Sequence, residues 1–428
     1  MGDYILRCPD GEIVEESIHT LACRFGHKGL LRTEYRAKCL MPREFAGIYK
    51  FYDWLPVRSV LNTRSAPIAF QSEGLFRELG LKNLWIGFTG YYPERGAYTA
   101  SCSFKEMEAL PTYSRVTDFG GGTVLLASAG NTARAFAQVA GETGCKCLIV
   151  VPKRSADRLK VTKNAGNTRL FTVNGDYTDA IEMSERIAAL GGFILEGGAR
   201  NVARRDGMGT VLLEGVLTMG RLPDHYFQAV GSGTGAISAW EASKRLLEDG
   251  RFGSKLPTLN LSQNLPFVPM QRAWDAGRRD ITKEDLGDSA YDSGLIYADV
   301  LANRRPPYGI PGGLFDAMSA CGGRFFGISE TEARSAGKLW SSVELVSLDP
   351  AANVALASLI RAVEEDMISD EDITFLNITG GGLDRAEEEL GLVTILPEAG
   401  LKKEMSDEEL RETIYEGKYE NENMRVKI

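Results

Sequence analysis

Apolar segments that alternate with amphipathic helices along most of this chain constrain its fold more than any other feature. Segment 123–152, TVLLASAGNTARAFAQVAGETGCKCLIVVP, has the pattern of a strand, a glycine turn, a helix and a second strand. Segment 225–250 repeats the order of strand, glycine loop and helix. Strands joined by helices of this length run parallel in their sheet. The pattern therefore predicts an α/β fold, with parallel or mixed sheets flanked by helices.

Further elements extend this alternation into two series. We expect helices near 158–165, 177–190 and 352–367, a strand at 169–173, and a strand that enters a glycine loop at 373–382. Two such series predict two α/β domains that face each other across a cleft. The predicted division is a small N-terminal unit at 1–50, a large domain at 51–117 and 215–400, a small domain at 118–214, and a C-terminal tail at 401–428.

Composition excludes several classes of function. The chain has 428 residues, with 49 Lys and Arg against 58 Asp and Glu and a net charge of −9. This balance argues against a general nucleic-acid binder, which needs a basic face. No apolar run approaches the ~18 residues of a membrane span, and no signal-peptide core is visible. We therefore expect a cytoplasmic protein with small-molecule substrates and without nucleic-acid or membrane partners. We also expect a homo-oligomer.

Two segments in the first half of the chain carry residues that could do chemistry. Lys105 follows Ser103 and leads into a predicted helix, although a lone lysine is most often a surface residue. The segment SAGNT, 128–132, lies between an apolar strand and a helix. Unpaired amides and the helix dipole favour an anion at such a junction. Ser128 and Asn131 could instead simply cap the helix.

Two further segments lie in the second half. The loop VGSGTGA, 230–236, joins a strand to a helix, and its backbone N–H groups could hold a phosphate. A tight turn without a ligand is the simpler alternative. In NITGGGL, 377–383, Thr379 ends a buried strand beside a glycine turn. Each of the four segments is a weak signal alone, but their conjunction and order are specific.

This order of parts resembles that of the fold-type-II pyridoxal-phosphate enzymes, and the motifs are similar to those of the threonine synthase family. The family's lysine motif S-F-K-D-R-G corresponds to residues 103–108, which read SFKEME. Further matching segments are ASAGNTARA at 127–135, NVARRDGMGTVLLE at 201–214, VGSGTGAI at 230–237, DPAANVALASL at 349–359 and TGGGLD at 379–384. The resemblance covers about 60–390. Within the family, the chain most resembles a branch of archaeal cysteate synthases.

The resemblance implies pyridoxal 5′-phosphate as the cofactor and a β-replacement that converts O-phospho-L-serine and sulfite to L-cysteate and phosphate, a step of coenzyme M biosynthesis. Lys105 would form the Schiff base with the cofactor and remove the Cα proton. Asn131 would contact the ring 3-hydroxyl and Thr379 the ring nitrogen. The cofactor phosphate would lie on Gly231, Ser232, Gly233, Thr234 and Gly235, and the substrate carboxylate on Ser128, Ala129, Gly130 and Thr132.

The substrate phosphate and sulfite are both anions, so an acidic protein must gather positive charge locally to bind them. The candidates from the sequence are Arg95, Lys160 and Arg205, with Ser103 as a neutral donor beside them. A charged side chain at a sheet edge is more often simply solvated. The sequence therefore leaves the identity of the anion-binding cation open.

Two departures from the family pattern favour a reaction other than threonine synthesis. The D-R-G that follows the lysine is replaced by Glu106-Met107-Glu108, and the family's T-G-H-G is T-G-G-G at 379–382. The N-terminal unit is also similar to the family's paired-cysteine ribbon, with half of the cysteines lost. It retains Cys8, Cys23 and a nearby His27. Because structural zinc sites nearly always have four Cys or His ligands, we predict no metal.

Other functions remain open at this stage. They are a threonine synthase acting on O-phosphohomoserine, a cysteine synthase that uses phosphoserine, and an amino-acid-binding regulatory protein without activity. A nicotinamide dehydrogenase is a further alternative, since residues 231–236 satisfy G-x-G-x-x-A. That site needs an acidic residue at the end of the next strand, where this chain has Gln263 and Asn264, so the dehydrogenase is disfavoured.

Overall fold

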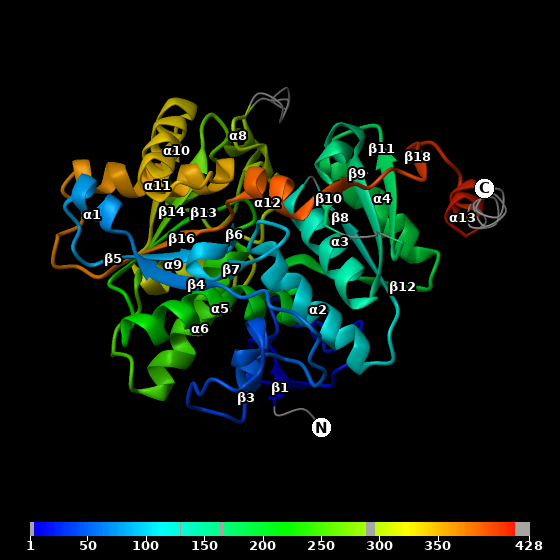
Figure 1. Ribbon diagram of the computed structural model, residues 1–428. Helices are drawn as coiled ribbons and strands as arrows, with labels where there is room; N and C mark the ends of the chain where they lie inside the picture. Colours follow the sequence, from blue (N-terminus) through cyan, green and yellow to red (C-terminus); the bar gives the residue numbers. More distant parts are fainter. Residues whose placement is uncertain (1–3, 129, 163–165, 288–295, 416–428) are drawn as a thin grey trace.

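The structure, a computed structural model, describes residues 4–128, 130–162, 166–287 and 296–415. Two β-sheets with five and six strands form its centre, and helices pack against both (Figure 1). The predicted α/β class with parallel and mixed sheets is confirmed. None of the described helices is long and apolar enough to cross a membrane.

The six-stranded sheet has the order β15-β14-β13-β16-β5-β4. These strands are Arg324–Ile328, Thr258–Asn264, His225–Ala229, Thr374–Ile378, Leu84–Phe88 and Ile68–Gln71. All neighbours run parallel except β4, which is antiparallel to β5. Successive side chains of a strand point to opposite faces. Tyr226 therefore packs in the core formed with α5 (Val202–Met219) and α6 (Thr234–Asp249), whereas Phe227 packs with α11 (Pro350–Glu364).

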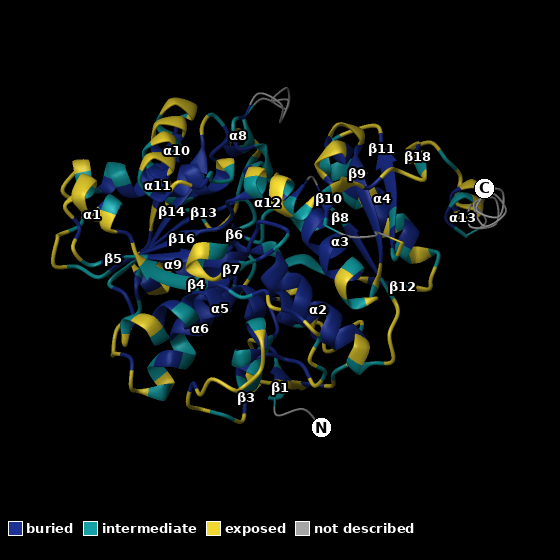
Figure 2. Ribbon diagram, viewed as in Figure 1, coloured by how far each residue is buried: buried dark blue, intermediate teal, exposed yellow. Residues whose placement is uncertain are grey.

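The five-stranded sheet is entirely parallel, in the order β12-β8-β9-β11-β18. Its strands are Phe193–Leu195, Thr123–Ala127, Lys146–Pro152, Thr168–Val173 and Ala399–Leu401. The same alternation places Leu126 with α3 (Asn131–Thr143) and Leu125 with α4 (Tyr177–Ala189). Helix α2 (Lys105–Asp118) packs between α3 and α5. Figure 2 shows the strands of both sheets as mostly buried and the outer helix surfaces as exposed.

The remaining elements are short or peripheral. They are β1 (Tyr4–Arg7), β2 (Ile13–Val14), β3 (Arg32–Tyr35), η1 (Gly47–Trp54), α1 (Glu73–Leu79), β6 (Tyr91–Tyr92), η2 (Pro93–Arg95), β7 (Ala97–Tyr98), η3 (Lys153–Arg158), β10 (Lys160–Val161), η4 (Gly198–Arg200), α7 (Pro269–Asp275), α8 (Lys283–Leu286), η6 (Asp299–Leu301), α9 (Leu314–Cys321), α10 (Glu330–Glu344), α12 (Leu383–Leu390), β17 (Val393–Thr394) and α13 (Asp407–Tyr415). Strands β1 to β3 form a separate small sheet in the N-terminal unit.

One expected element is wrong. Instead of a helix near 158–165, Arg158 ends a 3-10 turn, and Lys160 and Val161 form β10, which pairs antiparallel with β17. Residues 163–165 lie outside the described residues. The pairing partner comes from more than two hundred positions further along the chain, so local periodicity could not reveal it.

The division of the chain into domains stays a prediction, but two contacts cross its boundaries. Strand β18, at the border between the predicted large domain and the tail, pairs with β11 of the five-stranded sheet. Most of α5 lies in the predicted small domain by sequence, yet this helix packs on α6 and on strands β4 and β5. Both sheets are therefore completed by distant parts of the chain.

Close packing of α2 on α5 predicts the effect of adding one methyl group. A Cβ at Gly207 would lie 2.0 Å from the carbonyl oxygen of Met107 and 2.7 Å from Cγ of Pro111. Because neither the backbone of α2 nor the proline ring can move away easily, we expect Gly207→Ala to destabilise the fold, as overpacking typically does by about 1–3 kcal/mol. Differential scanning fluorimetry should show a lower melting temperature.

Gly209→Ala on the same helix is the matched control. Its Cβ would approach no atom closer than 3.3 Å, the distance to the Ser238 carbonyl oxygen, and alanine favours the helix by about 1 kcal/mol. We expect a much smaller loss, or none. Equal melting temperatures for both variants would contradict the tight crossing of α2 and α5.

Candidate active site

A cavity lies where the carboxyl ends of β8, β13 and β16 face the beginning of α2. It has about 830 Å³ of atom-free space, which includes the open solvent at its mouth. The predicted site residues that line it are Ser103, Lys105, Ser128, Gly130, Asn131, Thr132, Gly231, Ser232, Gly233, Thr234, Gly235 and Thr379. Ala129 lies outside the described residues. Four segments that are far apart in the sequence thus meet at one place.

Lys105 is positioned by backbone contacts of the two residues that precede it. Ser103 forms a β-bridge with Gly380, and the Phe104 N–H donates to the Thr379 carbonyl at 3.0 Å. These contacts tie the lysine loop to the end of β16, which is the central part of the large sheet. The Lys105 side chain is 19% exposed, and it lines the cavity.

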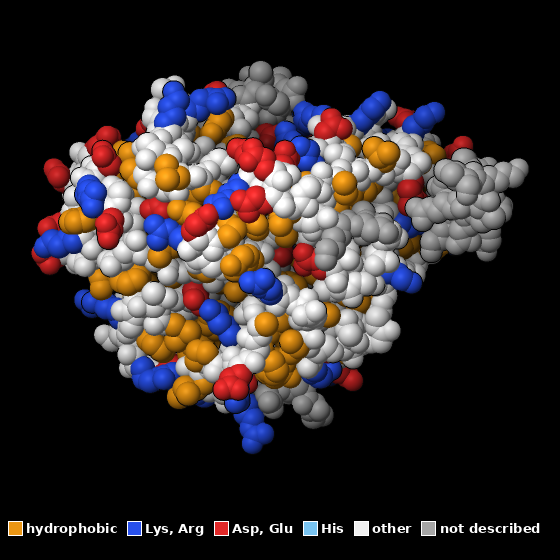
Figure 3. Space-filling view, viewed as in Figure 1, with side chains coloured by type: hydrophobic (Ala, Val, Ile, Leu, Met, Phe, Trp, Pro, Cys, Tyr) orange, Lys and Arg blue, Asp and Glu red, His pale blue; other side chains and the backbone are white. Residues whose placement is uncertain are grey.

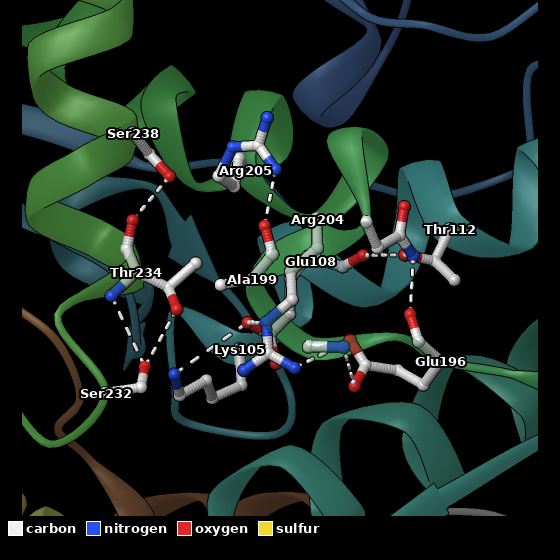
Figure 4. Close-up of polar contacts among 12 residues, drawn as sticks. Lys105, Glu108, Thr112, Glu196, Ala199, Arg204, Arg205, Ser232, Thr234 and Ser238 are labelled. Carbon is white, nitrogen blue, oxygen red and sulfur yellow. Dashed lines mark hydrogen bonds and ion pairs between the residues drawn. The ribbon is translucent and has the colours of Figure 1, made fainter. Parts of the chain in front are cut away.

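A chain of buried charges surrounds the Lys105 amine (Figure 4). Nζ of Lys105 lies 3.8 Å from Oε2 of Glu108, which is one turn further along α2 and fully buried. The same carboxylate oxygen lies 2.9 Å from Nε of Arg204 on α5. Nη1 of Arg204 donates to Oε1 of Glu196 at 2.6 Å. Two cations and two carboxylates therefore alternate within one buried network.

Burial dominates the protonation of this network. It lowers the pKa of Lys105, and the nearby Glu108 carboxylate opposes that shift without reversing it. Burial also raises the pKa of Glu108, against the opposing effect of Arg204. A lysine in such a place gives up its proton more readily than one in water. A larger share of the amine is therefore neutral at a given pH, and the neutral amine is the form that acts as a nucleophile or a base.

The glycine loop after β13 faces the lysine from the opposite side of the cavity. The hydroxyls of Ser232 and Thr234 lie 2.8 Å apart, and Figure 4 shows them on the side toward which the Lys105 amine points. Gly233 has φ of +77° and begins α6. A Cβ at Gly231 would lie 3.0 Å from the carbonyl oxygen of Val300. The loop thus needs glycine, and the N-terminus of α6 offers N–H groups to an anion.

The SAGNT segment caps α3 as well as lining the cavity. Oγ of Ser128 accepts from the N–H groups of Gly130 and Ala133, both at 3.1 Å. Nδ2 of Asn131 donates to Oδ2 of Asp349 at 3.2 Å. An amide nitrogen has a second hydrogen to donate, so Asn131 can still bind a ligand. Ser128 can therefore cap α3 while Asn131 is still available to bind a ligand.

The three cations chosen from the sequence do not reach the cavity. Arg205 is buried, but its Nε binds Glu241 at 3.0 Å, and its other nitrogens donate to backbone carbonyls. Lys160 is paired with Glu387, and Arg95 is paired with Glu344 at 2.7 Å. Each is held by a carboxylate elsewhere, so their contact with substrate anions stays a prediction that these ion pairs oppose.

Arg204 is the cavity residue that sequence reasoning missed. It lines the cavity with Tyr177 and Gln228, which were also not predicted. Adjacent residues on a helix point about 100° apart, so only one of Arg204 and Arg205 can face the cavity. The sequence offered both, and nothing local distinguished them. On the face in Figure 3, basic and acidic side chains are interspersed, whereas the cation at the cavity is buried.

Comparisons with known proteins agree with this geometry. A family model described as pyridoxal-phosphate dependent enzyme matches residues 71–380. The fold is similar to maize serine racemase, with a TM-score of 0.57 and 17% identity, over 74% of this chain and 88% of that one. It is also similar to an L-serine ammonia-lyase from Rhizomucor miehei, with a TM-score of 0.57 and 18% identity, over 78% and 100%. Fold and cavity thus define a pyridoxal-phosphate-dependent enzyme of fold type II.

Closer relatives narrow the class. A cysteate synthase from Methanocorpusculum labreanum is 54% identical over 91% of this chain and 95% of its own length. A cysteate synthase from Methanoculleus marisnigri is 51% identical over 92% of each chain. The chain belongs to the cysteate synthase family. The expected enzyme class and cofactor are confirmed with it.

The proximity of the Glu108 carboxylate to Lys105 predicts that replacing Glu108 changes the Lys105 pKa. Only the neutral amine reacts with pyridoxal phosphate, so the rate of reloading the apoenzyme should rise through the Lys105 pKa, below its usual 10.5. In Glu108→Gln the ammonium loses a favourable negative charge, so the pKa should fall further. We expect the midpoint of the rate profile, followed by absorbance, to move to lower pH.

Glu106→Gln is the control on the same helix. The Glu106 carboxylate accepts from the Ser101 N–H at 2.9 Å, and among the described residues the ion pair of the Lys105 amine is with Glu108 instead. Burial raises its pKa to about 7, so a neutral amide resembles the form that is already populated near that pH. The midpoint should stay in place. A shift of the Glu108→Gln midpoint to higher pH would show that the carboxylate does not favour the ammonium.

Proposed function

We propose that this enzyme converts O-phospho-L-serine and sulfite into L-cysteate and inorganic phosphate. In this reaction the Cβ–O bond of phosphoserine breaks, phosphate leaves, and the sulfur lone pair of sulfite forms the new Cβ–S bond. The Cα proton is removed before phosphate leaves and is returned afterwards. The observation that supports this proposal most is the buried Arg204 beside Lys105, in a chain whose close relatives are named cysteate synthase.

The residues of the cavity fit pyridoxal phosphate. The loop of residues 231–235 at the start of α6 would hold its phosphate, and Lys105 would hold its aldehyde carbon. Asn131 would contact the ring hydroxyl, and Thr379 would contact the ring nitrogen. When bound, this cofactor withdraws electrons from Cα and so acidifies the Cα proton. A neutral hydroxyl at Thr379 would make that withdrawal weaker than a carboxylate would, which favours prompt loss of phosphate.

Lys105 moves the Cα proton in this proposal. Its amine must be neutral to accept a proton, and burial lowers its pKa in that direction. Glu108, which lies 3.8 Å away, stabilises the ammonium after the transfer. Proton return to Cα then restores the neutral amine for the next turnover.

Arg204 binds the anions. A guanidinium has five N–H donors and stays charged at all relevant pH values. Its Nε faces Glu108, its Nη1 donates to Glu196, and no partner of Nη2 occurs among the described residues. The remaining donors can bind the phosphate of the substrate and, after its departure, sulfite. Ser103 is a neutral donor in the same cavity.

The N-terminus of α3 binds the substrate carboxylate. Ser128, Gly130 and Thr132 line the cavity at this helix end, and the N–H groups of a first helical turn have no partners within the helix. The helix dipole favours a negative charge there. Carboxylate and phosphate of one substrate would thus be held by different elements, with Lys105 between them.

Product analysis tests the proposal. Purified holoenzyme is incubated with phosphoserine and sulfite, and the amino-acid product is identified by mass spectrometry; we expect cysteate with equimolar phosphate. Lys105→Ala should give no product and lose the absorbance of the lysine-bound cofactor while remaining folded. Threonine formed from O-phosphohomoserine, with phosphoserine and sulfite ignored, would replace the proposal by threonine synthase activity.

Replacing Arg204 should selectively weaken the binding of the two anionic substrates. Removing one charge-assisted contact typically costs about 1.5–3 kcal/mol, which corresponds to roughly tenfold or more in affinity. We expect Arg204→Lys to raise the KM of phosphoserine and of sulfite by at least about tenfold. Lysine keeps a positive charge near Glu108 and Glu196, so the variant should still fold.

Lys160→Ala is the comparison for that prediction. Lys160 is paired with Glu387 outside the cavity, so both KM values should stay near those of the unaltered enzyme. A larger effect at Lys160 than at Arg204 would favour the cation chosen from the sequence. Steady-state kinetics with each substrate varied in turn makes the comparison.

Two broader expectations stay predictions. The first is that copies of this chain associate, which sedimentation of the holoenzyme tests. The second is a cytoplasmic location, which fractionation of the source cells tests.

A further inference from the structure

Two cysteines and one histidine of the N-terminal unit form a compact cluster. The sulfur atoms of Cys8 and Cys23 and a ring nitrogen of His27 all lie within 4.8 Å of one another. Cys8 follows strand β1, and Cys23 and His27 belong to the long connection between β2 and β3. Both thiols are free and buried. This cluster is distant in sequence from every residue that the proposed reaction uses.

The distances in the cluster match those between ligands of one tetrahedral metal ion. Nδ1 of His27 lies 3.3 Å from Sγ of Cys8 and 3.6 Å from Sγ of Cys23. Two ligands of zinc, one sulfur and one nitrogen, lie about 3.5 Å apart when their bonds are about 2.3 and 2.0 Å long. Oδ2 of Asp10 is a further 3.5 Å from Nδ1, which also suits an oxygen ligand of the same ion.

The backbone around the cysteines forms two equivalent turns. In each, a glycine three residues after the cysteine donates its N–H to the cysteine carbonyl, Gly11 to Cys8 at 2.9 Å and Gly26 to Cys23 at 3.1 Å. Both glycines have positive φ, +90° and +77°, so the chain reverses sharply after each cysteine. These two turns direct both sulfur atoms to the same point.

The N-terminal unit has little apolar material around this cluster. Its local core consists of Leu6, Cys8, Val14, Cys23, Leu31 and one residue of α5, Val202. Ile5, Ile13 and Phe25 of the same unit are exposed. Other residues of the unit, such as Leu30, Tyr35 and Ile48, pack into the main core, so only the part around the cysteines has so small a core. A disulfide or a metal commonly supports such a part. The cysteines are free, which favours a metal.

We propose that Cys8, Cys23 and His27 bind a structural zinc ion, with the Asp10 carboxylate turning in as the fourth ligand. Thiolate and imidazole are the ligands that zinc prefers, and a closed tetrahedral set is typical of structural sites. This replaces the expectation of no metal, which rested on the loss of half of the cysteines. The carboxylate takes one of the positions that a cysteine would otherwise fill.

The ion would also fix the unit against a loop near the active site. Directly after His27, the Leu30 N–H donates to the Pro311 carbonyl at 3.0 Å, and a Cβ at Gly29 would lie 2.9 Å from the same oxygen. Residues 299–303, which precede Pro311 by about ten positions, line the cavity that contains Lys105. Zinc would therefore stabilise the attachment of this loop without touching the substrate.

Elemental analysis of the purified holoenzyme tests the proposal. We expect about one zinc per chain, and the same amount in Cys39→Ser, which removes an exposed cysteine of the same unit outside the cluster. Cys8→Ser and Cys23→Ser should lose the metal and melt at a lower temperature. If these variants do not fold, cobalt exchanged into the unaltered enzyme should give the long-wavelength bands of tetrahedral cobalt, where pyridoxal phosphate does not absorb.

Other outcomes would overturn the proposal. They are the absence of zinc together with no uptake of added Zn²⁺, zinc that persists in both cysteine variants, or two fewer free thiols, which would indicate a disulfide. Asp10→Ala should retain zinc but release it faster to a chelator, and an unchanged release rate would remove Asp10 from the ligand set. None of these measurements depends on the proposed catalytic reaction.

Discussion

The ion pair between Glu108 of α2 and Arg204 of α5 is the interaction on which the active site depends. Both side chains are buried, and charges in such a place are costly unless they are paired. Removing one partner of a buried pair typically costs about 3–5 kcal/mol, because the other charge is left without compensation. The pair therefore couples three properties: the crossing of the two helices, the protonation of Lys105 and the position of the cation in the cavity.

A second constraint acts from the opposite end of the lysine loop. The Phe104 N–H is bound to the Thr379 carbonyl, and Ser103 is bridged to Gly380, so the loop moves with the central strand of the six-stranded sheet. The glycine loop follows the neighbouring strand of that sheet, while Ser128 follows a strand of the other sheet. The site thus lies at the carboxyl ends of parallel strands, which is where open α/β sheets bind ligands.

Much of this arrangement could be predicted from the sequence, because its signals are local. The periodicity of strands and helices predicted the two series of alternating elements, and the glycines at the strand ends indicated three of the segments that line the cavity. Arg204 could not be separated from Arg205, since the choice depends on how α5 is rotated against α2 and α6. The pairing of β10 with β17 and the approach of Cys8 to His27 are long-range contacts, and periodicity contains no information about them.

Each of the two departures from the threonine synthase pattern has a local structural counterpart. The position of the family's histidine is Gly381, where a Cβ would lie 2.8 Å from the Ser347 carbonyl oxygen and 3.1 Å from the Phe88 ring, so no larger side chain fits. The position of the family's glycine after the lysine is Glu108, which holds Arg204. The position of the family's titratable histidine thus has no side chain, while Arg204, which is always charged, lines the cavity. Water needs a base to become a nucleophile. In the proposed reaction, sulfite would attack with a lone pair that is already available and would need only a fixed cation to bind it.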